Sequence, residues 1–277
     1  MNIHFCILLA TVTVFAWQPV VLAYNLSYKD KELSAWVADL RNKSSQPVRD
    51  EAKESIRQIG TNALPFLLEE LRTLGVLWQN NITNFYSKPE IVERQMRLRA
   101  TFEVLGSIAK PAIPILRERM NENGFVADTS QHALIQIDPA IAARVLTEAL
   151  TNKHYYVSCA AANNLFSLNT NAEIAVTVLL KTLRDNSSNT NDSRNLRSFS
   201  ANALGAIGKQ PETIVPVLAR VIQDDESPLV RLSAVRALAK FGTNATPALP
   251  MLWQVSTNDP QTHVRSSASV AIQTIQK

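Results

Sequence analysis

The side chains most often used in catalysis and metal binding are few in this sequence and lie far apart. The four histidines are His4, His132, His154 and His263, and none lies within four residues of another. Zinc sites usually draw on closely spaced His and Cys ligands, so the spacing predicts no such site. The sequence also lacks a G-x-S-x-G nucleophile motif and a Gly-rich phosphate loop. We therefore expect no catalytic residue, no cofactor and no metal, and predict a protein that is not an enzyme.

Three smaller features invite a chemical interpretation and have a simpler structural one. His154-Tyr155-Tyr156 stands at a helix start and could hold a ligand, although we favour a packed turn. Asp224-Asp225-Glu226 precedes a helix that begins at a proline, and acidic residues are favoured near a helix N-terminus without any metal. Cys6 lies in the apolar N-terminal segment, which leaves Cys159 as a partly buried small residue rather than a nucleophile.

A recurring segment supplies the elements that would have to position any site. Arg231 stands eleven residues before Gly242, and the same spacing separates Arg197 from Gly208 and Arg49 from Gly60. The copies begin at Val48, Arg97, Val126, Val157, Leu196, Val230 and Val264, at steps of 49, 29, 31, 39, 34 and 34 residues. A period in this range is typical of a solenoid, because one unit alone cannot bury its apolar face.

Each copy predicts two helices. In the copy at Val230 the apolar positions are Ala234, Ala237, Leu238 and Phe241, an i, i+3, i+4, i+7 pattern that marks one face of an α-helix. The closing glycine is suited to the left-handed residue just past a helix end. A proline and a second apolar stretch follow, as at Pro216 and Pro250, and proline is tolerated in the first turn of a helix. The unit is therefore a first helix, a tight turn and a second helix.

This pattern resembles the HEAT repeat, in the short bacterial form that also occurs in phycobilin lyases. The resemblance covers about residues 48–277 and is strongest at 48–72 and 196–277. It implies an all-α fold, a right-handed α-α superhelix of about seven helix pairs with the last incomplete. The second helices, here called B helices, would line its concave side.

Residues 24–47 form an N-terminal capping segment, and its part from Tyr28 to Val37 resembles a short module that precedes HEAT repeats in exported proteins of environmental bacteria. In this chain the module reads Tyr28-Lys-Asp-Lys-Glu-Leu-Ser-Ala-Trp-Val37. We expect Ser34 to cap a short helix whose Trp36, Val37 and Leu40 cover the open end of the stack, since terminal repeats need such caps.

The resemblance also implies a structural ladder of arginines. In HEAT proteins an arginine of the first helix pairs with an aspartate of the turn between repeats. Asp225 and Asp259 lie six residues before Arg231 and Arg265, which fits such pairing. The expected ladder comprises Arg49, Arg197, Arg231, Arg265, Asp225 and Asp259.

The N-terminal segment predicts export. Residues 1–23 contain no charged side chain, and an apolar run from Phe5 to Trp17 is followed by Val21-Leu22-Ala23, which has small residues at the −3 and −1 positions of a cleavage site. We expect a cleaved signal peptide and a periplasmic or extracellular protein. The alternative is an inner-membrane anchor through residues 5–23, and a membrane contact is expected only in that case.

Length and charge limit the function classes. The chain has 277 residues, of which 46% are hydrophobic, enough for the core of one elongated solenoid over residues 48–277. The net charge of +4 is modest, and the densest basic cluster, Arg94 to Arg99, would spread over several faces of a helix. We therefore expect no nucleic-acid partner, and a monomer.

Two insertions interrupt the repeats. The first, about Leu74–Val92, carries Trp78, Phe85 and Tyr86, which either contact a partner or fold back on the stack. The second, Asp185–Ser193, is small and polar and predicts a loop in which Asp192 or Ser193 caps the next helix.

These observations favour a non-catalytic, exported scaffold that binds an unknown protein partner. The alternatives are an enzyme with this fold, such as a bilin lyase, and a nucleic-acid-binding HEAT protein. Candidate contact residues lie on the insertion and at polar positions of the B helices: Trp78, Phe85, Tyr86, Glu69, Arg72, Arg117, Arg220, Gln223 and Gln254.

Overall fold

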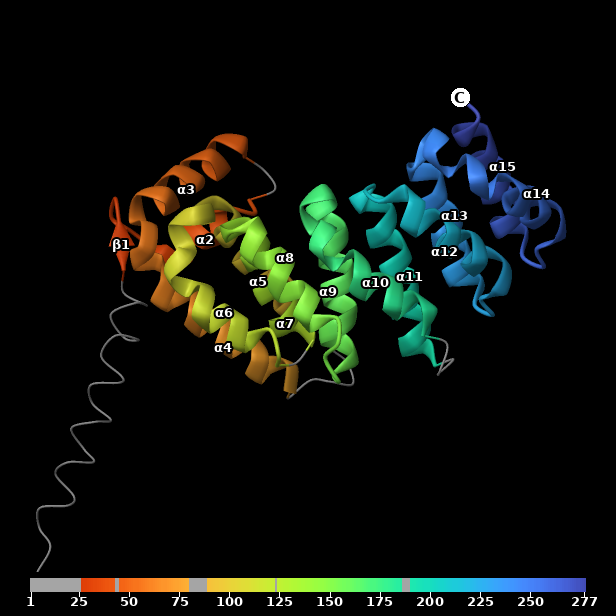
Figure 1. Ribbon diagram of the computed structural model, residues 1–277. Helices are drawn as coiled ribbons and strands as arrows, with labels where there is room; N and C mark the ends of the chain where they lie inside the picture. Colours follow the sequence, from red (N-terminus) through yellow and green to blue (C-terminus); the bar gives the residue numbers. More distant parts are fainter. Residues whose placement is uncertain (1–25, 43–44, 80–88, 123, 186–189) are drawn as a thin grey trace, which may run out of the picture. The chain divides into compact units, whose positions relative to one another are not determined.

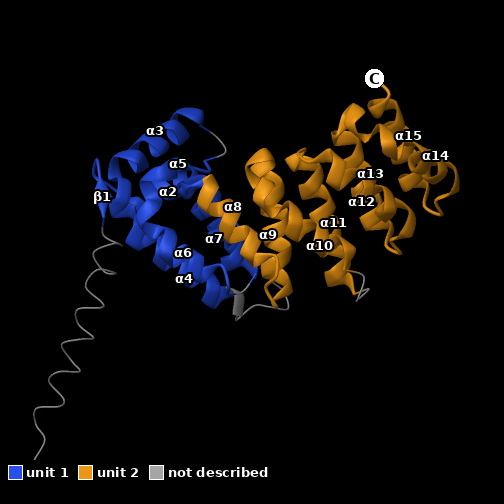
Figure 2. Ribbon diagram, in the orientation of Figure 1, with its two compact units in different colours: residues 1–138 blue, residues 139–277 orange. Residues whose placement is uncertain are grey.

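The chain is built from short helices, as predicted, in a computed structural model that describes residues 26–42, 45–79, 89–122, 124–185 and 190–277 (Figure 1). The expected signal peptide, residues 1–23, lies outside the described residues. The helices group into two compact units, residues 1–138 and 139–277 (Figure 2). The all-α prediction is confirmed.

The first unit begins with a hairpin that the sequence did not indicate. Strands β1 (Ser27–Tyr28) and β2 (Lys31–Glu32) are antiparallel, and the turn between them places Lys29 and Asp30 at positive φ. Helix α2 (Leu33–Asp39) follows at once and packs against the helices α3 (Gln46–Ile59) and α5 (Pro89–Leu105). Ser34 therefore lies inside this helix, and the expectation that it caps the helix is wrong, because Glu32 holds the capping position.

Three residues predicted to cover the end of the stack are buried in this unit. Trp36, Val37 and Leu40 are each less than a tenth exposed, and the Trp36 Nε1 donates to the Tyr28 carbonyl at 3.0 Å. The ammonium of Lys31 lies 3.9 Å from the centre of the indole ring. The hairpin and α2 thus form one apolar cap on the first unit.

The remaining helices of the first unit alternate between first and B helices. In chain order they are α3 (Gln46–Ile59), η1 (Gly60–Ala63), α4 (Leu64–Gln79), α5 (Pro89–Leu105), η3 (Gly106–Ala112), α6 (Ile113–Arg119) and α7 (Gly124–Ile137). Helix α5 packs against both α3 and α7, so the first helices lie in a row. The B helix α4 packs on α5 and α7.

The second unit continues the alternation. Its helices are α8 (Pro139–Ala149), α9 (Tyr155–Leu168), η4 (Asn169–Ala175), α10 (Val176–Arg184), α11 (Asn191–Ile207), α12 (Pro211–Asp224), α13 (Pro228–Lys240), η5 (Gly242–Ala248), α14 (Leu249–Asn258) and α15 (Thr262–Ile275). The first helices α9, α11, α13 and α15 pack in sequence, and the B helices α10, α12 and α14 contact one another in the same order.

The turns between the helices of a pair need a positive φ, and the predicted glycines supply it. Gly60, Gly208 and Gly242 have φ values of +61°, +61° and +54°, and Asn169 takes the same place after α9. Gly106 also has a positive φ of +49° and ends α5. Since Gly60 closes the copy that begins at Val48, the matching start before Gly106 is Arg94, and the start expected at Arg97 is wrong.

The insertions are shorter than expected. Helix α4 continues to Gln79 and α5 begins at Pro89, so much of the stretch from Leu74 to Val92 is helical. After the second insertion, α11 is capped by Thr190, whose hydroxyl accepts from the Ser193 backbone N–H at 3.3 Å. The expectation that Asp192 or Ser193 caps this helix is wrong, because both lie in its first turn.

Candidate binding surface on the B helices

A buried ion pair ties α11 to the turn after α12. The Arg197 Nε donates to the Asp225 Oδ2 at 2.8 Å, and its Nη2 donates to Oδ1 at 3.2 Å. The two side chains are only 4% and 2% exposed. Two parallel bonds fix the relative orientation of a guanidinium and a carboxylate. Asp225 thus has a structural partner, which the interpretation of Asp224-Asp225-Glu226 as helix-dipole residues did not include.

The next repeat has the same arrangement. Arg231 of α13 donates to both carboxylate oxygens of Asp259, at 2.7 and 3.0 Å, and also to the carbonyl of Asp225 at 2.9 Å. The carboxylate of Asp225 accepts from the Ser227 backbone N–H at 2.8 Å, and that of Asp259 from the Gln261 N–H at 2.8 Å. Each aspartate therefore shapes its turn and joins two repeats.

The electrostatics of Asp259 follow from these contacts. Burial by itself raises the pKa of its carboxyl group. The hydrogen bonds from Arg231 and the Gln261 N–H, with the positive charges of Arg231 and Arg265, outweigh burial and hold the pKa below its usual value. The carboxylate form is therefore the one built into the fold.

The ladder is shorter than the sequence suggested, and its register differs. Arg197 pairs with Asp225 and Arg231 with Asp259, in each case the aspartate 28 residues later in the chain. The aspartate six residues before Arg231 offers it only a backbone carbonyl. Arg265 makes only the backbone contact with the aspartate before it, donating to the Asp259 carbonyl at 2.5 Å. Arg49 pairs with no acidic residue in the described part of the chain and donates to the Asn42 carbonyl and the Gln46 side chain. The inclusion of Arg49 in an arginine–aspartate ladder is wrong, because no aspartate stands at the corresponding turn.

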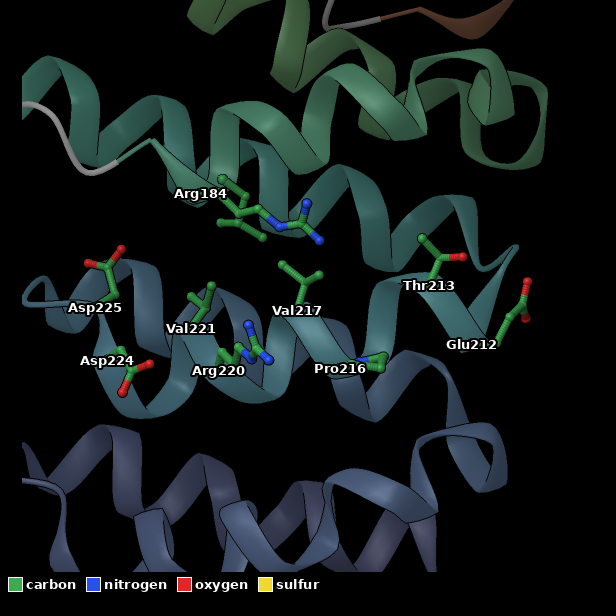
Figure 3. A pocket seen from close by; sticks show the side chains of 10 residues that line it. Arg184, Glu212, Thr213, Pro216, Val217, Arg220, Val221, Asp224 and Asp225 are labelled. Carbon is green, nitrogen blue, oxygen red and sulfur yellow. The ribbon is translucent and has the colours of Figure 1, made fainter.

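A groove lies between the B helices α10 and α12, next to the ladder residue Asp225. The groove has a volume of about 340 Å³. Its floor is apolar, formed by the buried side chains of Leu183, Val217 and Val221. The guanidinium groups of Arg184 and Arg220 lie on either side of Val217 (Figure 3).

A second groove lies between α12 and α14. It has a volume of about 330 Å³, with Met251 and Val255 on its apolar side. Gln223 and Gln254, two of the predicted contact residues, line it and are exposed. Asp224 and Asp225 line both grooves, so the two hollows are neighbours. We call the exposed surface of α10, α12 and α14, with these two grooves, the B-helix face.

The structure brings only part of the predicted contact set together. Arg220, Gln223 and Gln254 share the B-helix face of the second unit. Glu69 and Arg72 lie on α4 of the first unit and bond to each other, with the Arg72 Nε 2.8 Å from a Glu69 carboxylate oxygen. That bond lowers the pKa of Glu69 against the opposing effect of burial. Arg117 is exposed on α6 of the same unit.

The three aromatic residues of the first insertion have no described side chains. Phe85 and Tyr86 lie outside the described residues, and Trp78 lies in the last turn of α4 with a side chain that is also outside them. Their role in partner contact stays a prediction.

Sequence reasoning missed Arg184 and Glu212, which complete the first groove. Arg184 is the last residue of α10, and Glu212 lies in the first turn of α12. The repeat pattern marks apolar positions and turns, so it carried no signal for Arg184. The helical positions of Glu212 and Arg220 relative to Val217 do place them around one face of α12.

The remaining candidate residues take part in helix packing or lie at the surface. The Asn195 side chain donates to the Tyr155 hydroxyl at 2.9 Å, which ties α9 to α11, whereas Tyr156 is exposed. Cys159 is buried, and burial raises the pKa of its thiol to about 12. A thiol with so high a pKa holds almost no thiolate at neutral pH and is a poor nucleophile.

His132 is half-buried beside the ion pair of Arg99 and Asp128. Burial and the charge of Arg99 lower its pKa, against the opposing charges of Asp128 and Glu103. Its Nδ1 has no hydrogen-bond partner in the described residues. The side chain is therefore neutral in the folded protein at neutral pH.

Within the described ranges, no group of three or more His, Cys, Asp or Glu residues is placed to hold a metal ion. In the same ranges no helix is long and apolar enough to cross a membrane.

Three comparisons with known proteins were made at the level of family, sequence and structure. A family model described as HEAT repeats matches residues 189–273. No curated protein matches the sequence. An engineered protein of known structure is 20% identical with a TM-score of 0.46, and the match covers 88% of this chain and 96% of that one. A designed armadillo repeat protein is 18% identical with a TM-score of 0.42, over 88% of this chain and 100% of that one. Human deoxyhypusine hydroxylase in complex with glycerol is 21% identical with a TM-score of 0.37, over 88% of this chain and 96% of that one.

Proposed function

Because the chain is a HEAT-repeat protein, we propose that it is an exported, non-catalytic scaffold that binds a protein partner through the B-helix face of its second unit. The observation that carries this proposal is the pair of adjoining grooves on α10, α12 and α14. A repeat fold offers a long surface of this kind, and it binds by contact over many residues.

The chemistry of the grooves supports a protein as the partner. Their floors are apolar and their rims carry charged and amide groups, the combination usual at protein interfaces. The first groove is lined by Glu212 and Asp224 as well as by Arg184 and Arg220, so it lacks the uniformly basic lining that favours a polyanion such as a nucleic acid.

The ladder supports a rigid scaffold. Its bonds join Arg197 to Asp225, Arg231 to Asp259 and Arg231 to the Asp225 carbonyl. They tie α11 to the turn after α12 and α13 to the turn after α14. A surface held in advance loses less entropy when a partner binds.

The test is affinity capture from an envelope fraction with the full chain and three variants. Arg220→Glu reverses a charge on the B-helix face, and Arg236→Glu makes the same change at an exposed position of α13. The third variant replaces Trp78, Phe85 and Tyr86 with alanine. We expect one dominant partner that Arg220→Glu loses and Arg236→Glu keeps. Loss with the alanine variant would add the insertion to the interface, and equal capture by both arginine variants would contradict the proposed face.

Export has its own test. Mass spectrometry of the protein from its native source should find Tyr24 as the first residue if residues 1–23 are a cleaved signal peptide. A chain that starts at Met1 and sediments with membranes would support the anchored alternative, and a full-length chain in the cytoplasmic fraction would contradict export.

A further inference from the structure

The groove between α10 and α12 contains two arginines that the fold does not use. Arg184 and Arg220 both line it, and neither forms an ion pair or a hydrogen bond with another described residue. Arg197 and Arg231, which belong to the ladder, are buried and doubly bonded to carboxylates. The ladder therefore explains why Arg197 and Arg231 are present, but no structural contact within the described part of the chain explains Arg184 and Arg220.

The first unit offers a useful contrast. A hollow of similar size beside Val37 has five charged lining residues, Glu70, Glu90, Glu93, Arg94 and Arg97. There both arginines are paired with carboxylates, because Arg94 bonds to Glu70 at 2.7 Å and Arg97 lies 3.4 Å from Glu93. In that hollow of the first unit both arginines are paired, whereas the two arginines of the α10–α12 groove are not paired with any described residue.

The charges of the groove follow an order along its length. The two guanidinium groups flank Val217 in the middle, Glu212 lies at one end, and Asp224 lies at the other beside the buried Asp225 (Figure 3). Glu226 and Asp224 continue this acidic end into the next groove. A complementary ligand therefore carries negative charge at its centre and positive charge toward the Asp224 end.

We propose that this groove binds an extended segment of a partner protein in which an aspartate or glutamate is seated between Arg184 and Arg220. An aliphatic side chain next to that residue would lie on Leu183, Val217 and Val221, and a lysine or arginine of the segment would face Asp224. This inference rests on the proposed function and names the kind of segment that the B-helix face selects.

The dimensions of the groove favour an extended segment over a folded surface or a free ion. A volume of about 340 Å³ accommodates a few side chains. Guanidinium groups form paired bonds with the planar carboxylate, and they do so more strongly over an apolar floor than in open water. Inorganic phosphate alone would leave the floor and the acidic ends unused.

The experiment is a selection from a random peptide library displayed on phage, with the full chain immobilised. Wild type is compared with Arg184→Gln/Arg220→Gln and with a matched control, Lys209→Gln/Arg236→Gln, which changes two exposed basic residues outside the grooves. We expect wild type and the control to enrich peptides with an acidic residue beside an aliphatic one. The groove variant should lose the acidic preference and bind the selected peptide about tenfold more weakly.

A charge reversal separates this role from a structural one. In Arg184→Glu/Arg220→Glu the central preference should change from acidic to basic, which a variant that merely weakens the fold would not show. Circular dichroism checks that each variant retains its helices. Titration with inorganic phosphate and with a free acetylated glutamate tests whether a simple anion suffices.

The outcomes are distinguishable. Enriched peptides without an acidic residue, or with the same residue preference for wild type and both groove variants, would overturn the assignment of the two arginines while leaving a protein-binding scaffold in place. Failure to enrich any peptide, together with no captured partner, would overturn the proposed function as well. Phosphate binding as tight as that of the selected peptide would replace the peptide segment with a simple anion.

Discussion

Gly205 of α11 lies directly against Ala237 of α13, so that a β-carbon on Gly205 would stand 2.7 Å from the Ala237 Cα and 2.8 Å from its Cβ. Side-chain carbons do not approach a backbone so closely. The two first helices can therefore pack at this distance only because one of them has no side chain at the crossing point. The buried hydroxyls of Ser198 and Ser233, 2.8 Å apart, join the same two helices.

Gly205→Ala should destabilise the protein by about 1–3 kcal/mol, because the added methyl group meets backbone that cannot turn away. The loss should appear although alanine favours a helix by about 1 kcal/mol over glycine. Urea unfolding followed by circular dichroism measures the change. Ser266→Ala at an exposed position of α15 is the control and should leave the free energy of unfolding unchanged. An equal stability of Gly205→Ala and wild type would contradict the close packing.

Asp225→Asn should cost about 3–5 kcal/mol of the free energy of unfolding, because it leaves Arg197 as an uncompensated buried charge. The asparagine oxygen can still accept from the Ser227 N–H, so the turn itself keeps its bond. Asp224→Asn, next in the chain and exposed, is the matched control and should change stability by less than about 0.5 kcal/mol. Similar losses at the two positions would show that the ladder is not the cause.

Trp36→Ala should destabilise the first unit by about 3–5 kcal/mol, because it empties the cap formed by the hairpin and α2. Trp36→Phe keeps the apolar ring and should cost less, although the bond to the Tyr28 carbonyl is lost. Ser34→Ala tests the corrected view of the helix start and should have almost no effect. The three variants are compared by thermal unfolding, and a large loss for Ser34→Ala would restore a capping role for that residue.

The sequence predicted the elements of this fold far better than its charged contacts. The spacing of Ala234, Ala237, Leu238 and Phe241 identified a helix because burial of one face repeats with the helical period. The turn glycines were found for a different local reason, since a positive φ strongly favours glycine. Asp225 was recognised as a turn residue, but its bonds to Arg197 depend on how successive repeats stack.

The candidate groove was predictable only in part. Arg220 and Gln254 were chosen because polar positions of a B helix must face outward. Arg184 was missed because it ends α10 just before the polar insertion, where the repeat pattern no longer constrains residue types. Arg184 and Arg220 line the same groove because α10 and α12 pack side by side, and no local sequence pattern encodes that packing.

Protonation of His132 should destabilise the first unit as the pH falls. Its pKa in the folded protein lies below the ordinary value of 6.5, chiefly because burial disfavours the imidazolium form and Arg99 repels it. The unfolded chain then binds the proton more readily than the folded one. Stability is complete above that ordinary value and declines as the pH is lowered toward the folded-state pKa.

Urea unfolding at a series of pH values between about 7 and 5 measures the decline. His132→Gln should flatten it, whereas His263→Gln, at an exposed position before α15's first buried residue, should leave it as in wild type. A pH dependence that is unchanged in His132→Gln would place its origin elsewhere in the chain.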